Sequence, residues 1–243
     1  MATQILLPGE AIPPASLPAP KKPNGTLTLG PGLLHSPPST ITTTTSGILN
    51  TDAKKSASWL ESTPTNRYQP SVNDLVIAQI HHSSTDLYHC ALTPNAPFAL
   101  LGQLAFENAS RKTRPQLKGG DLVYARVKAA GKRGEDVEVE CVNSATGKAE
   151  GMGPLKGGMV FEVSPGFARR LMLGGKKGGV VVLEEVGEKC RFEVAVGRNG
   201  RVWVDSGSVG EVIGIGRLLV QADEEGWGVE EQKKRVKGFL KGV

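Results

Sequence analysis

The side chains with the clearest chemical potential are aromatic rings and cations between residues 68 and 118. Aromatic rings stack on nucleic-acid bases, and Lys and Arg pair with the phosphates of the backbone. The candidate rings for stacking are Tyr68, His81, His82, Tyr88, His89, Phe98 and Phe106. The candidate cations are Arg111, Lys112, Arg114 and Lys118. Together these residues predict a surface that binds single-stranded RNA.

Each of these side chains also has a structural alternative. Successive residues of a strand point to opposite faces, so about half of the aromatic residues in strands belong to a core. The alternative for Phe106 is packing beneath the segment that follows it. Arg111, Lys112 and Arg114 are three cations within four residues of a polar segment, and such a group is costly to bury. Their alternatives are a solvated loop and contact with a neighbouring protein subunit.

His81 and His82 raise the question of a metal site. Adjacent residues of a regular strand point to opposite faces, so we expect the two rings to lie apart and not to share one ion. The sequence contains no Cys-x-x-Cys pair and no His-x-x-x-His pair, which are common in zinc sites. We therefore predict no metal site and no other cofactor.

The sequence Gly197-Arg198-Asn199-Gly200 is compatible with two structures. Asn-Gly between the β-branched and aromatic segments 191–196 and 201–204 indicates a hairpin, with Asn199 in the left-handed region. The same four residues fit the Gly-x-x-Gly loop with which KH domains clamp a nucleic-acid backbone. That clamp lies between two helices, whereas both flanking segments here have the pattern of strands. We favour the structural hairpin, with Trp203 packed near a domain boundary.

No arrangement of residues predicts catalysis. Gly151-Met152-Gly153-Pro154 lacks the Lys-Ser/Thr of a phosphate-binding loop, and we interpret it as a tight turn between domains. Residues 174–179 are predicted to form a flexible, basic loop that contacts solvent, RNA or an acidic partner. No Ser-His-Asp order is accompanied by a nucleophile elbow, and the carboxylates do not cluster at metal-ligand spacing. We therefore predict that the protein is not an enzyme.

The length and composition allow two small domains with real cores, or one large domain. The chain has 243 residues and a net charge of +5, which suits nucleic acid or an acidic partner. Its three cysteines are far apart and odd in number, so we expect a reducing compartment and no disulfide framework. No apolar run approaches the ~20 residues of a membrane span, and the first residues lack the pattern of a secretory signal.

Residues 1–66 differ in composition from the rest of the chain. Prolines crowd residues 13–23 and threonines occupy residues 42–45, and this composition argues against an independent core. Residues 5–9 and 27–32 are candidates for short strands that pair with neighbours rather than with each other. We therefore predict an N-terminal arm or a small strand-containing domain, partly disordered.

Residues 67–148 are expected to form a small barrel of β-strands. Short apolar and β-branched segments joined by turns are typical of such a barrel. The predicted strands are 74–80, 86–92, 98–102, 121–127 and 137–142. Gly119-Gly120-Asp121 is the turn that enters the fourth strand, and residues 132–136 form the hairpin tip before the fifth.

Residues 149–243 are expected to mix helices and strands. Ser164 followed by Pro165 is a helix-start signal, because serine caps the first turn and proline fits the first helical position. Apolar residues at helical spacing predict two further helices near the C-terminus. The predicted elements are a strand at 159–163, a helix from Pro165 to the glycines at 174 and 175, an apolar run at 180–183, the hairpin around Asn199, and helices at 209–222 and 229–240.

The order and spacing of these motifs resemble the cap subunits of the eukaryotic RNA exosome, in particular the ribosomal RNA-processing protein 40 family. The resemblance covers the chain well from Tyr68 onward and the N-terminal region poorly. It implies a mainly β protein with an α+β part: an S1-type OB-fold barrel, then a KH-like α/β domain, preceded by the Pro/Thr-rich arm. The segments that carry it are Leu7-Pro8-Gly9-Glu10, Arg67-Tyr68-x-Pro70, residues 106–115 and 120–124, Gly151-Met152-Gly153, and residues 197–204.

The resemblance also implies a function, that of a non-catalytic RNA-binding cap subunit. Such a subunit sits with the other cap subunits on a ring of RNase PH-like subunits. It guides single-stranded RNA to the 3′–5′ exonuclease channel for rRNA processing and RNA decay, in the nucleus, the nucleolus and also the cytoplasm. No membrane and no small-molecule substrate is expected. Two alternatives stay open: a bracing subunit that binds no RNA itself, and a stand-alone S1/KH factor associated with ribosomes.

Overall fold

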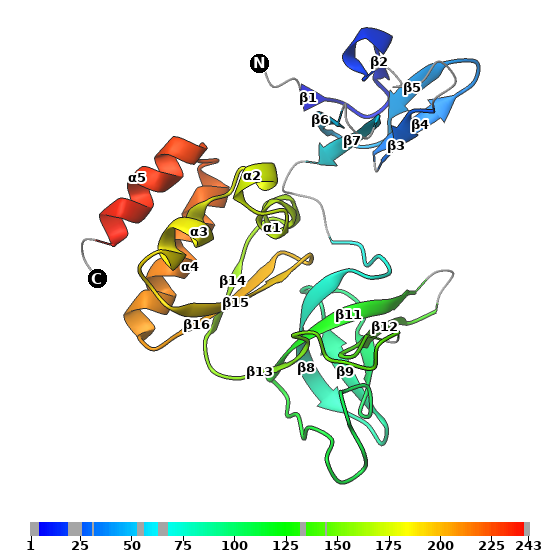
Figure 1. Cartoon of the computed structure of the whole chain (residues 1–243). Helices are drawn as coiled ribbons and strands as arrows, with labels where there is room; N and C mark the ends of the chain where they lie inside the picture. The colour runs from blue at the N-terminus through cyan, green and yellow to red at the C-terminus, as the bar shows by residue number, and fades with distance from the viewer. Residues whose placement is uncertain are drawn as a thin grey trace. The chain divides into compact units, whose positions relative to one another are not determined.

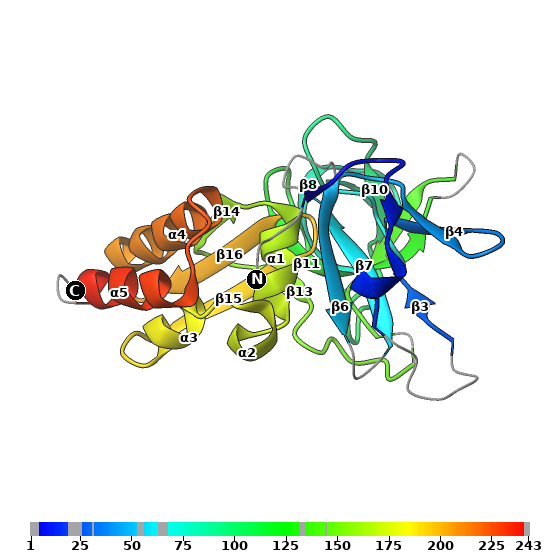
Figure 2. The same cartoon turned by 90° about the horizontal axis from the view of Figure 1, so that it is seen from above.

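The computed structural model describes residues 5–18, 26–30, 32–52, 56–62, 68–131, 135–143 and 145–240. The chain forms two compact units, Met1–Asn66 and Arg67–Val243 (Figure 1, Figure 2). The first unit is made mostly of short strands, and the second joins a barrel of strands to a module of helices and strands. Some residues of segments singled out in the sequence lie outside the described residues, namely the prolines at 20, 23 and 31, Arg67, and 132–134 of the predicted hairpin tip at 132–136.

The N-terminal unit contains two small sheets and one short 3₁₀ helix, η1 (Pro14–Ser16). One sheet has the strand order β1 (Ile5–Leu6), β6 (Gly47–Asp52), β7 (Ala57–Ser62) and β3 (Thr28–Leu29). The other has the order β2 (Ala11–Ile12), β5 (Thr40–Thr43) and β4 (Leu33–Ser36). As predicted, β1 and β3 pair with neighbouring strands, β6 and β7, and not with each other.

Strand pairing and a small core hold this unit together. Leu6, Ile12 and Leu60 are buried in its core. The threonine run contributes to β5 because β-branched residues favour strands. Thr43 is buried, and its hydroxyl donates a hydrogen bond to the backbone carbonyl of Leu7. The described residues of this region are therefore paired strands, and not the extended arm that the composition suggested.

The strands that follow the N-terminal unit form one sheet that closes into a barrel. The strands are β8 (Leu75–Ser83), β9 (Leu87–Ala91), β10 (Ala99–Gly102), β11 (Leu122–Ala130), β12 (Val137–Glu140) and β13 (Gly153–Leu155), in the spatial order β12-β10-β9-β8-β11-β13. Because β12 pairs in parallel with β10 and antiparallel with β11, the sheet closes on itself. All of the strands predicted for the barrel are present, and the predicted turn places Gly120 at φ +97°. The segment interpreted as an interdomain turn begins β13, which pairs with β11.

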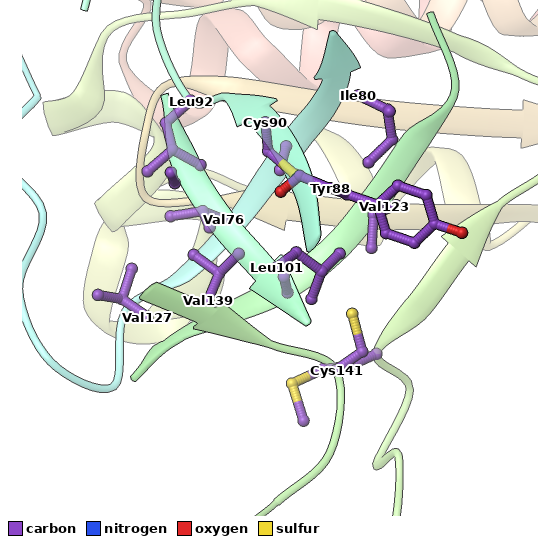
Figure 3. Packing of buried hydrophobic residues seen from close by; sticks show 14 of the residues in the cluster. Val76, Ile80, Tyr88, Cys90, Leu92, Leu101, Val123, Val127, Val139 and Cys141 are labelled. Atoms are coloured by element: carbon purple, nitrogen blue, oxygen red, sulfur yellow. The ribbon is translucent and has the colours of Figure 1, made fainter. Parts of the chain in front are cut away.

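The core of the barrel is built from alternate residues of its strands (Figure 3). Val76, Ala78 and Ile80 of β8 all point inward and are completely or almost completely buried. The free cysteines Cys90 and Cys141 lie in the same core, and burial raises the pKa of the Cys90 thiol to about 12. These thiols stay protonated and fill space as small apolar side chains.

The rest of the second unit is an antiparallel sheet packed against helices. The sheet has the order β14 (Met159–Glu162), β16 (Arg201–Ser206) and β15 (Phe192–Gly197). The helices are α1 (Pro165–Met172), α2 (Gly175–Gly178), α3 (Val182–Gly187), α4 (Val209–Glu224) and α5 (Val229–Phe239). Phe167, Val186, Val204, Ile215 and Val236, from four helices and β16, share one core. Among the described residues, no helix is both long and apolar enough to cross a membrane.

Most local signals in this module are confirmed. The Ser164 hydroxyl caps α1 by accepting the N–H of Phe167 at 3.1 Å, with Pro165 at the first helical position. Asp223 of α4 in turn accepts hydrogen bonds from the Ser164 amide at 2.6 Å and hydroxyl at 2.7 Å. Residues 174–179, predicted to be a flexible loop, contain the short helix α2. The apolar run at 180–183 leads into α3.

The turn of the β15–β16 hairpin has a different backbone conformation from the one that the sequence predicted. Gly197 pairs with Arg201, so three residues connect the strands. The residue in the left-handed region is Gly200, at φ +77°, and not Asn199. A three-residue hairpin loop commonly consists of a type I turn followed by a left-handed glycine. This geometry leaves the Asn199 side chain free to turn away from the hairpin.

Asn199 joins the hairpin to the barrel. Its Nδ2 donates to the carbonyl oxygens of Ile77 at 2.9 Å and Leu92 at 2.7 Å, and its Oδ1 accepts the N–H of Ile77 at 3.2 Å. The side chain is buried, so these three bonds are shielded from water. Gly197 permits this approach, because an added Cβ would lie 2.3 Å from the Asn199 Oδ1 and 2.7 Å from the Ile77 nitrogen.

Backbone bonds and apolar packing complete this junction. The Arg198 N–H donates to the Leu75 carbonyl at 2.7 Å. The Arg201 guanidinium donates to the Ala91 carbonyl at 3.2 Å, and burial lowers the pKa of this side chain. Trp203 is buried against Ile77, which confirms its predicted place near a domain boundary. The barrel and the α/β module therefore meet in a tight interface.

Replacing Asn199 with Ala should destabilise the protein strongly. The variant would leave buried peptide groups of Ile77 and Leu92 without partners, and each such group costs about 1–3 kcal/mol. We expect the free energy of unfolding to fall by about 3 kcal/mol, measured by urea denaturation and circular dichroism. The matched control is Asn143→Ala, which removes an amide bonded to the exposed Glu150 carboxylate and should cost less than about 1 kcal/mol. Equal losses in the two variants would contradict the importance of this junction.

Candidate nucleic-acid interface

Four aromatic side chains form a cluster at one end of the barrel. His81 and Phe98 have ring centroids 4.6 Å apart, and His82 stacks on His89 at 4.2 Å with an interplanar angle of 10°. His82 also meets Phe98 edge-on at 5.9 Å. His81 and His82 are exposed, Phe98 is 37% exposed and His89 is half-buried. This group, the ring cluster, offers aromatic faces on which bases can stack.

A β-bulge in β8 creates the ring cluster. Ile80 pairs with Cys90, but His82 pairs with His89, so one extra residue lies on β8 at this point. A bulge breaks the alternation of side chains along a strand. The prediction that His81 and His82 point to opposite faces is therefore wrong, and their Nδ1 atoms lie 2.9 Å apart. Among the described residues, no group of three or more His, Cys, Asp and Glu side chains is placed to hold a metal ion.

The surroundings of His82 favour its neutral form. Desolvation lowers the pKa of His82, and the nearby His89 and His81 lower it further. Because the ordinary histidine pKa is about 6.5, His82 is an uncharged ring at neutral pH. At that pH it can contribute stacking, while phosphate attraction must come from other side chains.

Lys118 lies on the loop that passes beside the ring cluster. The N–H of Gly120 donates to the Ile80 carbonyl at 2.8 Å, and an added Cβ on Gly119 would lie 3.0 Å from the His81 carbonyl oxygen. A shallow cavity of about 230 Å³ lies at this contact. It is lined by Gln79, Ile80, His81, Ala91, Gly119 and Gly120. The loop that carries the exposed Lys118 thus lies against the β8 backbone at Ile80 and His81, although it is distant from β8 in sequence.

Of the three other predicted cations, two are exposed and the third is held by a hydrogen bond to another side chain. Arg111 and Lys112 are exposed on a turn that the side chains of Ser110 and Thr113 shape. Arg114 is half-buried, and its guanidinium donates to the side-chain oxygen of Gln103, which is buried. Gln103 was not singled out in the sequence, because nothing in its local pattern marks a partner eleven residues away.

Tyr88 anchors the loop that carries these cations. Its hydroxyl donates to the Pro115 carbonyl at 2.7 Å and accepts the N–H of Leu117 at 3.3 Å. Its ring lies in the barrel core, as Figure 3 shows. Tyr88 therefore holds the loop in place and does not present a ring to RNA.

Two other aromatic candidates belong to the protein interior. Phe106 is only 7% exposed and packs in the barrel core, so its predicted role in base stacking is wrong. Tyr68 is half-buried, and its hydroxyl donates to the Asp74 carboxylate at 3.0 Å. Burial and the Asp74 charge raise the Tyr68 pKa. Asp74 also lies 3.7 Å from the Arg198 guanidinium, so Tyr68 supports the junction with the α/β module.

The Gly197–Gly200 hairpin is part of the junction between the α/β module and the barrel. Its Asn199 is buried and bonded to the barrel, so the loop does not form an open cradle for a phosphate. Its flanks are the strands β15 and β16, not helices. That this hairpin is structural and does not contact RNA stays a prediction.

Family models match three parts of the chain. Residues 27–65 match the "Exosome complex exonuclease Rrp40 N-terminal domain", and residues 68–153 match "Exosome complex component RRP40, S1 domain". Residues 158–210 match the KH domain. These matches confirm that the barrel is of the S1 type and that the α/β module is a KH domain.

Individual proteins are similar over most of the chain. Exosome complex component rrp40 of Schizosaccharomyces pombe is 37% identical, covering 96% of this chain and 93% of its own length. Exosome complex component RRP40 of Saccharomyces cerevisiae is 34% identical, covering 89% of this chain and 88% of its own length. A crystal structure described as an exosome complex RNA-binding protein matches with a TM-score of 0.57 and 23% identity, over 72% of this chain and 97% of that one, which supports the fold alone. By its identity to these relatives and its coverage of them, the chain belongs to the family of exosome complex component RRP40.

Proposed function

We propose that this protein is an RNA-binding cap subunit of the RNA exosome that helps guide RNA to the 3′–5′ exonuclease channel. The observation that carries the RNA-binding part is the ring cluster, together with the loop of Lys118 that lies against the backbone at His81. Stacking faces next to a cation are the combination with which OB-folds hold single strands. The names of its relatives, which are exosome complex components, support the assembly.

The proposal includes partners and location. The chain contacts RNase PH-like ring subunits and the other cap subunits, and it acts in rRNA processing and RNA decay. It works in the nucleus and nucleolus and also in the cytoplasm. It contributes no catalysis itself, since the chemistry on the described surface is that of stacking rings and phosphate-pairing cations rather than of a nucleophile with its base.

Purification of the tagged protein from its own cells tests the assembly. We expect a stoichiometric set of RNase PH-like proteins together with a processive 3′ exonuclease, identified by mass spectrometry. Recovery of ribosomal proteins, or of no stable partner, would contradict the cap-subunit role. It would favour a stand-alone S1/KH factor associated with ribosomes.

The double variant His81→Ala/Phe98→Ala should weaken RNA binding. Base stacking on an aromatic side chain contributes about 1–3 kcal/mol per base, so we expect at least about a fivefold loss of affinity. Fluorescence anisotropy with a labelled oligouridine measures it. The matched control is Leu34→Ala/His35→Ala, which removes an exposed apolar side chain and an exposed histidine from the N-terminal unit. Equal affinities of the two variants would favour a bracing subunit that does not bind RNA through this face.

Affinity for RNA should rise as the pH falls from 7.5 toward 5.5, because His82 of the ring cluster gains a positive charge near phosphates. The lowered pKa of His82 means that its charge arrives only below about pH 6.5. His82→Gln should therefore remove the rise at low pH, and it should also lower affinity at pH 7.5 because it removes one ring of the cluster. The same anisotropy assay across this pH range checks it, and an unaltered pH profile in His82→Gln would refute it.

The stability of the protein limits the range of that assay. The folded protein holds the pKa of His82 below its unfolded value, so the unfolded chain binds the proton more readily. Protonation of His82 therefore costs stability as the pH falls below about 6.5. Affinities are compared only where circular dichroism retains the folded signal.

A further inference from the structure

The shallow cavity between β8 and the loop of Lys118 adjoins the ring cluster. Its lining comes from β8, from the end of β9 and from the two glycines that precede β11. His81 belongs both to this lining and to the ring cluster, where its ring centroid lies 4.6 Å from that of Phe98. The cavity and the aromatic rings are therefore contiguous at His81.

The size of the cavity suits one flat group. Its volume is about 230 Å³, whereas pockets for drug-sized ligands measure about 300–1,000 Å³. Gly119 and Gly120 contribute only main chain to its wall. Gly120 has φ +97°, a value that favours glycine, and an added Cβ there would meet no atom within 4 Å. The space beside Gly120 is therefore open to a planar ligand such as a nucleic-acid base.

Gln79 carries the amide side chain of this lining. Main-chain groups around it are already paired: the Ile80 N–H donates to the Asp121 carbonyl at 2.8 Å, and the Gly120 N–H donates to the Ile80 carbonyl at 2.8 Å. The Gln79 side chain is exposed, and its Nε2 donates to the Gly120 carbonyl at 3.5 Å. Among the described contacts, its Oε1 accepts no hydrogen bond. The amide therefore retains hydrogen-bonding capacity for a ligand.

The remaining groups of this amide match the edge of adenine. A glutamine amide has two N–H donors and an oxygen acceptor. With one N–H turned to Gly120, the second N–H and the Oε1 are left side by side. Adenine presents the complementary pair, an amino donor next to a ring-nitrogen acceptor, and glutamine pairs with it through two hydrogen bonds. Proteins read unpaired RNA bases in this way while an aromatic ring, including that of histidine, stacks on the base.

Two properties favour adenine over the other bases. A purine has two fused rings and covers more of an aromatic face than a pyrimidine does, which strengthens stacking. Adenine offers its amino group beside a ring nitrogen on both its Watson–Crick and its Hoogsteen edge, whereas the corresponding N7–O6 edge of guanine presents two acceptors. Adenine can therefore satisfy the Gln79 amide from either edge.

We propose that Gln79 and His81 form a subsite that selects an adenine base in single-stranded RNA. The base stacks on the His81 ring, and its amino group and a ring nitrogen pair with the Gln79 amide. This inference rests on the proposed function, since it names the base preferred at a surface already proposed to bind RNA. The other stacking and phosphate contacts of that surface accept any base.

Three labelled strands of about ten nucleotides test the subsite by fluorescence anisotropy with the full-length protein. One is an oligouridine, the second carries a single central adenosine, and the third carries purine riboside, which is adenosine without its amino group, at that position. We expect the adenosine strand to bind roughly fivefold more tightly than the purine riboside strand, because one hydrogen bond is lost. Equal affinities of these two strands overturn the proposal.

The variant Gln79→Leu identifies the group that reads the base. Leucine has a similar length without hydrogen-bonding groups, so the adenosine and purine riboside strands should bind it equally. The matched control is Gln116→Leu, which removes an exposed glutamine of the Lys118 loop outside the cavity and should keep the fivefold preference. Circular dichroism checks that both variants are folded. A preference for adenosine that persists in Gln79→Leu also overturns the proposal.

The outcomes separate this inference from the proposed function. If His81→Ala/Phe98→Ala weakens binding of all three strands but the unaltered chain does not distinguish adenosine from purine riboside, RNA binding by the ring cluster stands and the adenine subsite is excluded. If the unaltered chain binds none of the strands even at low salt, the RNA-binding function and the subsite are overturned together.

Discussion

The second unit depends on one buried amide. Asn199 satisfies the N–H and C=O of Ile77 and the C=O of Leu92 at a point where the barrel would otherwise bury peptide groups without partners. An asparagine side chain can do this because it carries both donors and an acceptor. As the same side chain belongs to a hairpin of the KH domain, it fixes that domain to the barrel. Any RNA strand that meets both parts meets them at a fixed spacing.

The functional features arise where regular structure is interrupted. The bulge at His81 turns two neighbouring histidines to one side, and a regular strand would have separated them. The loop that carries Lys118 reaches His81 because Gly119 leaves room for close contact. Tyr88 spans the boundary between the two kinds of region, with its ring in the core and its hydroxyl holding the loop. The packed core keeps the barrel rigid, and the side chains proposed to contact RNA lie where its strands are irregular.

Local sequence patterns predicted the strands and helices, whereas contacts between distant residues determined the roles of individual side chains. The barrel strands, the cap at Ser164 and the last two helices follow from signals within a few residues, so they could be found in the sequence. The role of Asn199 could not, because its partner Ile77 is 122 residues away. The burial of Phe106 and the bulge at His81 likewise depend on neighbouring strands. The threonine run misled because its composition resembles a linker, while its β-branched residues pair as a strand.

The residues enclosed by the Gly197–Gly200 hairpin decide how its close approach to the barrel is used. Gly197 lets the main chain come close to Ile77. The enclosed asparagine can be buried at this contact, since its amide replaces the hydrogen bonds that water would make. A lysine in its place could not be buried without a paired charge. The asparagine is therefore the residue that allows this hairpin to join the KH domain to the barrel.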